Sequence, residues 1–320
     1  MDVRPQFQNW ESVDQKSSYN QIENVMDIET LEALSQIIGY VKYIYSTGKT
    51  GKENRVYFRG QTKHHCRGGI PSLSPSLFRG IQSNGAANKR VQNLNEFLQK
   101  SDKIFLGKEK NDKNTKKKDQ QYNFPKSLRK PVLQQYGMCT DWLDVVDNVW
   151  VALWFASHST QTFPKNDCTQ STRKITKFEC YQPSSEEYSY VYLIVVENVV
   201  YKKVGFFEEK GTCSPMEIVD LRVGLPSIYL RPHSQHGLML RRKTMEKDSD
   251  INYQDHLALV LRIKTKKILK WLGTSPLTSF PYLFPSPVFD LGYGILLHSL
   301  RCGYMDDCPE YCGSIAHVSG

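Results

Sequence analysis

The sequence predicts an α+β fold, because helical patterns come first along the chain and strand patterns come later. Apolar residues recur at helical spacing over residues 26–45, which is typical of an amphipathic helix. The runs 189–196 and 257–263 are rich in β-branched and aromatic residues, as buried strands are. We therefore expect N-terminal helices packed on a mainly antiparallel central sheet, which is either continuous or split.

Helix and strand patterns alternate in the first half of the chain. After the helix over 26–45, the aromatic pattern of residues 55–59 predicts a short strand, and the proline and serines of 72–83 indicate a loop. Helical spacing returns over 88–105. The segment 142–156 is apolar on nearly all sides, which predicts a helix at the centre of the domain.

The second half of the chain supplies most of the predicted strands. Besides the two long runs, Ile228–Leu230 and Gly237–Leu240 have the composition of short strands. Residues 108–118 are rich in lysine and lack apolar periodicity, so we expect a solvated loop there. The chain has no internal repeat and no sharp linker, which favours one main domain.

Composition and charge are typical of a soluble protein that meets anionic partners. No apolar run reaches the ~18 residues of a transmembrane helix, and the first residues lack the pattern of a secretory signal. We expect a cytoplasmic protein without a membrane partner, whose eight cysteines are reduced. The net charge of +9 favours phosphate-bearing partners, nucleic acid among them. No aromatic residues interleave the lysine-rich loop, which weakens the nucleic-acid interpretation.

The best candidate for a functional site is the end of the short aromatic strand, Tyr57–Gln61. Arg59 is always charged and carries five donors in a fixed fork, which suits phosphate or carboxylate. The neighbouring Gly60 would let the backbone approach a ligand closely. Phe78 and Arg79 follow after a proline-rich stretch, so we expect an anion-binding site in this part of the chain.

Four groups of residues, in order along the chain, resemble the motifs of the FRG domain, a family named for its Phe-Arg-Gly motif. The resemblance runs from about Tyr57 to Ile295, and it rests on Phe58–Gln61 with Pro75–Arg79, Gln135–Thr140 through Asp144 and Asn148 to Ala156, Arg231 with Gln235-His236-Gly237, and Leu283-Phe284-Pro285. It implies an N-terminal helical extension over 1–52, an FRG-like domain over 53–298 with a lysine-rich insertion near 107–121, and a C-terminal tail over 299–320.

The second group of motif residues departs from the family pattern at four positions. Glutamine, cysteine, aspartate and valine stand where the pattern has histidine, proline, arginine and tryptophan, at Gln135, Cys139, Asp141 and Val145. If that histidine or arginine handles substrate, this chain is altered there. Restoring histidine at Gln135 and arginine at Asp141 is then expected to raise activity, provided that the scaffold is an enzyme.

The aromatic-Arg-Gly strand end also resembles the first motif of ADP-ribosyltransferases, in which such an arginine holds the phosphate or ribose side of NAD. The resemblance implies NAD as a substrate and a transferase or NAD glycohydrolase activity, as in a toxin or defence effector. The implied catalytic residues are Arg59, Asp144 and Gln235, and the implied NAD-binding residues are Arg59, Gly60, Gln61, Tyr136 and Thr140. A glutamine lacks the full negative charge that such enzymes use, so Glu197 and Glu217 are alternatives to Gln235.

Structural roles compete with these functional ones. Arg59 would pair with Asp144 as a partly buried ion pair, Tyr136 would be a core aromatic, and Gln235 would bond a loop. Two other classes of function also stay open, a nucleotide- or nucleic-acid-binding module and a catalytically silent interaction domain. No metal is expected, because the spacing of His298, Cys302, Cys308 and Cys312 matches no paired-cysteine zinc motif.

Overall fold

The computed structural model describes residues 7, 10–20, 24–46, 53–67, 70–81, 83–100, 125–163, 178–243 and 252–301 of the 320-residue chain. Nine strands form one sheet: β1 (Ser18–Asn20), β2 (Val25–Ile28), β3 (Glu53–Gln61), β6 (Leu143–Val146), β9 (Tyr188–Lys203), β10 (Phe206–Glu209), β11 (Met216–Asp220), β12 (Gly237–Arg242) and β13 (Leu257–Lys264). Their order is β1-β2-β13-β9-β10-β11-β12-β6-β3, and β3 pairs with β9 as well. The expected α+β class is confirmed.

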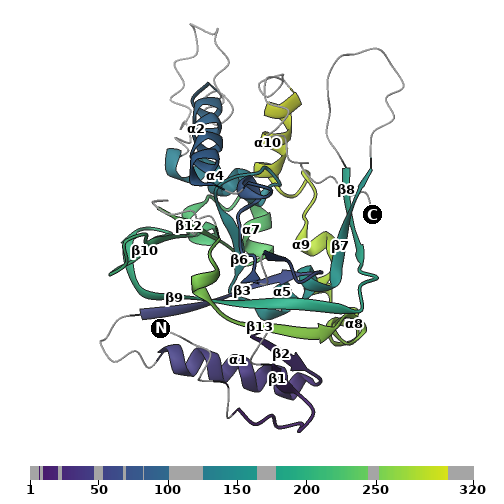
Figure 1. The fold of residues 1–320 in the computed structure, drawn as a ribbon. Coiled ribbons are helices and arrows are strands. Elements are labelled where there is room, and N and C mark those ends of the chain that lie inside the picture. Colours follow the sequence, from purple (N-terminus) through teal and green to yellow (C-terminus); the bar gives the residue numbers. More distant parts are fainter. Residues whose placement is uncertain are drawn as a thin grey trace, which may run out of the picture.

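The sheet closes on itself instead of splitting. Because β3 pairs with both β6 and β9, the strands β9, β10, β11, β12, β6 and β3 form a ring, which β13, β2 and β1 extend on one side (Figure 1). Every described pairing in this sheet is antiparallel except that of β2 with β13. The prediction of a mainly antiparallel sheet is therefore confirmed.

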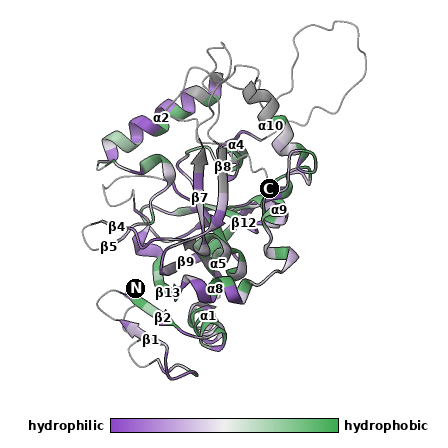
Figure 2. Cartoon of the chain, turned by 90° about the vertical axis from the view of Figure 1, so that its right-hand side faces the viewer, coloured by the Kyte–Doolittle hydropathy of each residue, from purple (hydrophilic) through white to green (hydrophobic). Residues whose placement is uncertain are grey.

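Helices surround the ring: α1 (Leu31–Ser46), α2 (Asn84–Lys100), α4 (Lys126–Gln135), α5 (Val149–Ser157), α6 (Leu221–Gly224), α7 (Leu230–Ser234), α8 (Thr265–Leu272), α9 (Phe280–Leu283) and α10 (Leu291–Arg301). Short 3-10 turns are η2 (Ser76–Phe78), η4 (Gln254–His256) and η5 (Pro276–Thr278). Two small ribbons complete the fold, β4 (Cys66–Arg67) with β5 (Ile70–Pro71), and β7 (His158–Phe163) with β8 (Phe178–Pro183). Hydrophobic residues gather along α1, whereas hydrophilic ones are frequent in α2 (Figure 2).

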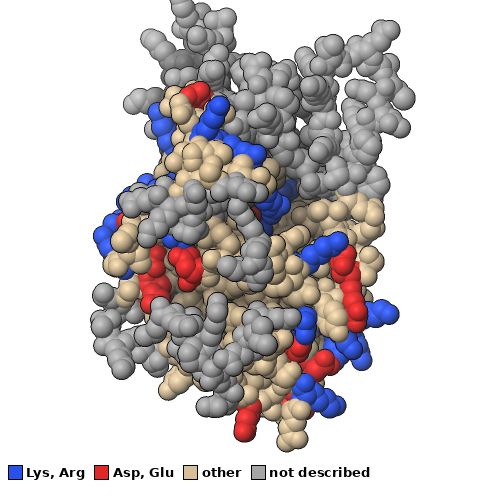
Figure 3. Space-filling model, in the orientation of Figure 1, with Lys and Arg blue, Asp and Glu red and all other residues tan. Residues whose placement is uncertain are grey.

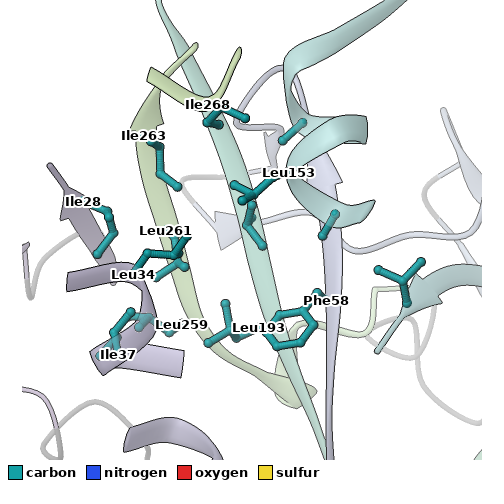
Figure 4. Close-up of a cluster of buried hydrophobic side chains, with 14 of the residues drawn as sticks. Ile28, Leu34, Ile37, Phe58, Leu153, Leu193, Leu259, Leu261, Ile263 and Ile268 are labelled. Atoms are coloured by element: carbon teal, nitrogen blue, oxygen red, sulfur yellow. The ribbon is translucent and has the colours of Figure 1, made fainter. Parts of the chain in front are cut away.

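The central strands are buried on both faces, which explains their nearly continuous apolar runs. Tyr57 and Ile194 belong to the cluster inside the ring. Phe58 and Leu193, one residue away in each strand, belong to a second cluster outside it. α1, α5 and α8 cover that outer cluster (Figure 4). Alternate residues of one strand therefore serve two cores.

The N-terminal helix begins later than its apolar pattern predicts. Met26 lies in β2, and α1 starts at Leu31, where the Thr30 hydroxyl accepts a hydrogen bond from Ala33 N at 3.2 Å. Both segments pack their apolar residues into the same outer cluster, so one apolar periodicity runs across a strand and a helix. The expected helix over 26–45 is thus wrong at its start.

The segment 142–156 is a strand followed by a helix, not the single central helix that was expected. β6 lies between β12 and β3, and α5 begins where the side chain of Asn148 accepts from Trp150 N at 2.9 Å. Both parts are buried, so no polar face reveals where the period changes from 2 to 3.6. A single asparagine cap marks the boundary.

Of the two short strands expected after residue 227, only the second exists. Gly237–Leu240 lies in β12, as predicted. Ile228 and Tyr229 instead follow a turn in which Tyr229 N donates to Pro226 O at 3.1 Å, and α7 begins at Leu230. The expected second helix over 88–105 is α2, which runs from Asn84 to Lys100; its expected last turn lies outside the described residues.

The remaining sequence expectations concern the lysine-rich stretch, the C-terminal tail, membrane-spanning helices and the surface charge. The lysine-rich stretch near 107–121 and residues 302–320 lie outside the described residues. None of the described helices combines the length and the apolar character needed to cross a bilayer. On the face drawn in Figure 3, acidic and basic side chains are interspersed at the lower right, and basic ones predominate around α2.

Candidate functional site

Arg59 lies near the end of β3, directly opposite Tyr192 of β9. Its side chain is 15% exposed, and Nη1 donates to the main-chain oxygen of Asp144 at 2.6 Å. The same Nη1 lies 4.0 Å from Asp144 Oδ2. Arg59 Nε is buried and has no hydrogen-bond partner among the described residues. The structure therefore brings Arg59 and Asp144 together.

Gly60 faces the helix that covers the outside of the ring. A Cβ atom at this position would lie 2.6 Å from Ala156 N and closer still to Ala152 O, both main-chain atoms of α5. Glycine is therefore required for the close approach of α5 to β3. The sequence predicted that Gly60 lets the backbone approach a ligand; in the structure, the group that approaches Gly60 closely is the main chain of α5.

Asp144 is held by a hydrogen-bonded group that we call the Arg59 site: Arg59, Asp144, Gln134, Thr140 and Ser76. Gln134 Nε2 donates to Asp144 Oδ2 at 2.8 Å. Gln134 Oε1 accepts from the hydroxyls of Thr140 at 2.8 Å and Ser76 at 3.1 Å, and from Thr140 N at 3.0 Å. These bonds fix which end of the Gln134 amide faces the carboxylate.

Thr140, an expected NAD-binding residue, is fully buried and acts within this group. Its hydroxyl bonds Gln134, and its main-chain oxygen accepts from Leu77 N at 3.2 Å. Sequence reasoning missed Gln134 and Ser76 as site residues. Both lie in or beside the motif residues that carry the family resemblance, and that proximity is the one signal that could have found them.

The electrostatics of the site combine burial with an excess of positive charge. Burial lowers the pKa of the Arg59 guanidinium, and Asp144 opposes this change. Burial raises the pKa of the Asp144 carboxyl, and Arg59 opposes it; solvent moderates the shift, because 41% of the side chain is exposed. Burial lowers the pKa of His65, and the charges of Arg79, Lys63 and Arg59 lower it further.

Aromatic side chains adjoin Arg59 on the next strand. Tyr192 is fully buried, and its hydroxyl lies 2.8 Å from His64 Nδ1. The His64 ring stacks on Tyr190 with centroids 5.1 Å apart. Gln61, an expected NAD-binding residue, pairs with Tyr190 in the strand register, and its Oε1 is buried without a hydrogen-bond partner among the described residues.

Tyr136, which was expected to bind NAD, is buried in a different hydrophobic cluster. Its hydroxyl donates to Asp290 Oδ2 at 2.6 Å. The Arg231 guanidinium lies 4.6 Å from the centres of both the Tyr136 and the Tyr293 rings. These contacts match the role of a core aromatic that the sequence left open.

Gln235, the expected catalytic glutamine, is buried and fully engaged. Its Oε1 accepts from Gln135 Nε2 at 2.6 Å, and its Nε2 donates to Leu283 O at 2.7 Å. Neither bond leads to Arg59 or Asp144. The glutamine at position 135, where the family pattern has histidine, is therefore paired with the glutamine of a later motif.

Asp141 is engaged in ion pairs within the fold. It is buried, and its Oδ2 lies 3.3 Å from both Lys130 Nζ and Arg241 Nη1. Glu217, one alternative to Gln235, pairs with Arg241. The other, Glu197, lies near Tyr45. The aspartate that replaces the arginine of the family pattern thus lies between two cations.

A second group of titratable residues, two of them with nearly buried side chains, lies at η4. His256 Nε2 is 3.2 Å from Glu209 Oε2, and His256 Nδ1 is 3.2 Å from Asp255 Oδ1. Burial lowers the pKa of His256, but the two carboxylates outweigh it and raise the pKa to about 9. This group links β10 to the start of β13.

A comparison of the chain with models of known protein families found a match. The model of the FRG domain matches residues 54–165. This chain carries an FRG domain. The matched part of the FRG domain contains all five residues of the Arg59 site and ends before Gln235. Neither the comparison with curated proteins nor that with solved structures found a significant match.

The FRG domain positions the site through its own motif residues. Phe58 packs into the outer cluster, Arg59 donates to the main-chain oxygen of Asp144, and Gly60 contacts α5. No group of three or more His, Cys, Asp or Glu side chains suited to a metal occurs within the described ranges. Cys302, Cys308 and Cys312 lie outside those ranges, and the side chain of His298 does as well.

Proposed function

We propose that this FRG-domain protein is an NAD-using enzyme of the ADP-ribosyltransferase type, acting in the cytoplasm as a toxin or defence effector. The observation that carries the proposal is the Asp144 carboxylate, which is 41% exposed and is held by Gln134 beside a fixed arginine. The site thereby offers the full negative charge that Gln235 lacks.

The chemistry assigns distinct tasks to the residues of the Arg59 site. When the bond between ribose C1′ and the nicotinamide nitrogen breaks, the electron pair leaves with nicotinamide and positive charge develops on the ribose. Asp144 stabilises that charge, and Arg59 keeps the carboxylate ionised. Water or a nucleophile of a target then adds to C1′ and gives up its proton. Gln134 and Thr140 hold the carboxylate in place.

Removing the charge of Asp144 tests the proposal. Asp144→Asn keeps an oxygen that accepts from Gln134, and we expect nicotinamide release from NAD to fall about 100-fold or more. Asp147→Asn is the matched control, because Asp147 is 39% exposed and pairs with Arg222 at the other end of β6. Equal activity of Asp144→Asn and the wild type contradicts the role of Asp144. No nicotinamide release by the wild type contradicts the enzyme itself.

A nucleotide-binding module without turnover is the second candidate, and the bond between Gln135 and Gln235 favours it. Both of these motif residues are occupied with each other, so neither faces a substrate. In this alternative NAD binds but is not consumed. If nucleic acid is the ligand, its affinity will fall steeply with added salt in proportion to the phosphates contacted.

A further inference from the structure

The first motif group contains two arginines, Arg59 and Arg79. Hydrogen bonds hold the main chain of Arg79, but no described residue bonds its side chain. Its N donates to Ser76 O at 3.3 Å, and Arg90 Nη1 donates to its main-chain oxygen at 3.2 Å. Gly80 follows with a φ of +76°, a turn conformation that favours glycine. The backbone of Arg79 is therefore held on both sides.

The Arg79 side chain is exposed, and the described residues offer its guanidinium no hydrogen bond or ion pair. Arg59 is the opposite case. Its Nη1 donates to Asp144 O and its Nε is buried, so its guanidinium offers an external anion fewer open N–H groups than that of Arg79 does. The arginine whose side chain is available to a ligand is therefore Arg79, which lies outside the Phe-Arg-Gly triplet.

Two bonds place Arg79 beside the Arg59 site. Ser76, three residues earlier, donates its hydroxyl to Gln134, and Leu77 N donates to Thr140 O. The charge of Arg79 also reaches the site, where it lowers the pKa of Arg59. An anion bound by Arg79 would therefore lie close to Asp144.

We propose that Arg79 is the phosphate-binding residue of this site and that it takes the diphosphate of a nucleotide. An exposed guanidinium without a hydrogen-bond partner breaks no protein contact when it binds an anion, and it can bond two phosphate oxygens at once. The identification of that nucleotide with NAD rests on the proposed function, because the phosphate contact itself requires no chemistry. Arg59 is then a positioning residue that orients Asp144 and takes no part in gripping phosphate.

Calorimetric titration with ADP and with inorganic pyrophosphate tests this assignment without turnover. We expect Arg79→Ala to weaken the binding of both probes about 10- to 100-fold, and Arg79→Lys to lose less. Lys266→Ala removes one exposed positive charge from α8 and is the matched control, with unchanged binding.

Each outcome decides a different claim. Wild-type affinity of Arg79→Ala, no binding of either probe by the wild type, or an equal loss in Lys266→Ala overturns the assignment. Loss of probe binding in Arg79→Ala without NAD turnover by the wild type upholds it and refutes the proposed function. A second measurement is the NMR titration of His65, whose pKa should rise when Arg79 is removed, since Lys63 and Arg59 are the remaining cations that lower it.

Discussion

Replacing Gly60 with alanine tests whether the glycine of the Phe-Arg-Gly motif serves packing. The added Cβ would lie 2.6 Å from Ala156 N, about 0.8 Å inside ordinary van der Waals contact at 3.4 Å, and closer still to Ala152 O. Both atoms belong to the main chain of α5, so no side-chain rotation relieves the clash. The helix must move away from β3, and we expect a loss of about 3 kcal/mol in the free energy of unfolding.

Urea unfolding of Gly60→Ala and of a control at Gly39 measures this effect. Gly39 lies within α1, and a Cβ there meets no atom within 4 Å. Gly39→Ala is therefore expected to stabilise the protein by about 0.5–1 kcal/mol, because alanine is the better helix former. A loss below about 1 kcal/mol in Gly60→Ala, together with a large loss of ADP binding, would refute the reasoning and return Gly60 to a ligand-binding role.

Two further predictions concern the buried ionised groups. The pKa of His256 is raised from 6.5 to about 9, so protonated His256 stabilises the fold fully below pH 6.5, and this stabilisation is lost as the pH rises through 9. Urea unfolding across this range should show a decline of roughly 3 kcal/mol in the free energy of unfolding, and His256→Gln should lack that decline. Asp141→Arg, one half of the double change that restores the family pattern, would place a third cation beside Lys130 and Arg241. We expect thermal unfolding to show a loss of at least about 3 kcal/mol in stability, and a normal melting temperature would contradict this.

Much of the fold could be predicted because local composition carries it. The runs 189–196 and 257–263 are strands whatever their partners, since β-branched and aromatic residues suit a pleated, buried surface. Two of the errors fell where two elements share one apolar run. Met26 and Val146 are strand residues next to helices, and only their hydrogen-bonded partners distinguish the two states.

The site was predicted in part for a similar reason. The motif resemblance named Arg59 and Asp144, which the structure brings together over a separation of 85 residues. It also named Tyr136 and Gln235, which face other partners. A motif can include residues that the packing of the fold requires as well as residues that bind or react with a ligand. Gly60 illustrates this, since its close approach is to a helix.

An α+β protein with an FRG domain can be recognised from the amino-acid sequence, because strand composition and motif order are local properties. Three features emerge only from the folded chain: the sheet closes into a ring, Gln134 holds Asp144, and the Arg79 side chain is exposed while Arg59 Nε is buried. Ring closure depends on β3 pairing with two strands far away in sequence. Which arginine remains available to an anion depends on burial and hydrogen-bond partners, and these are set by residues that no local pattern identifies.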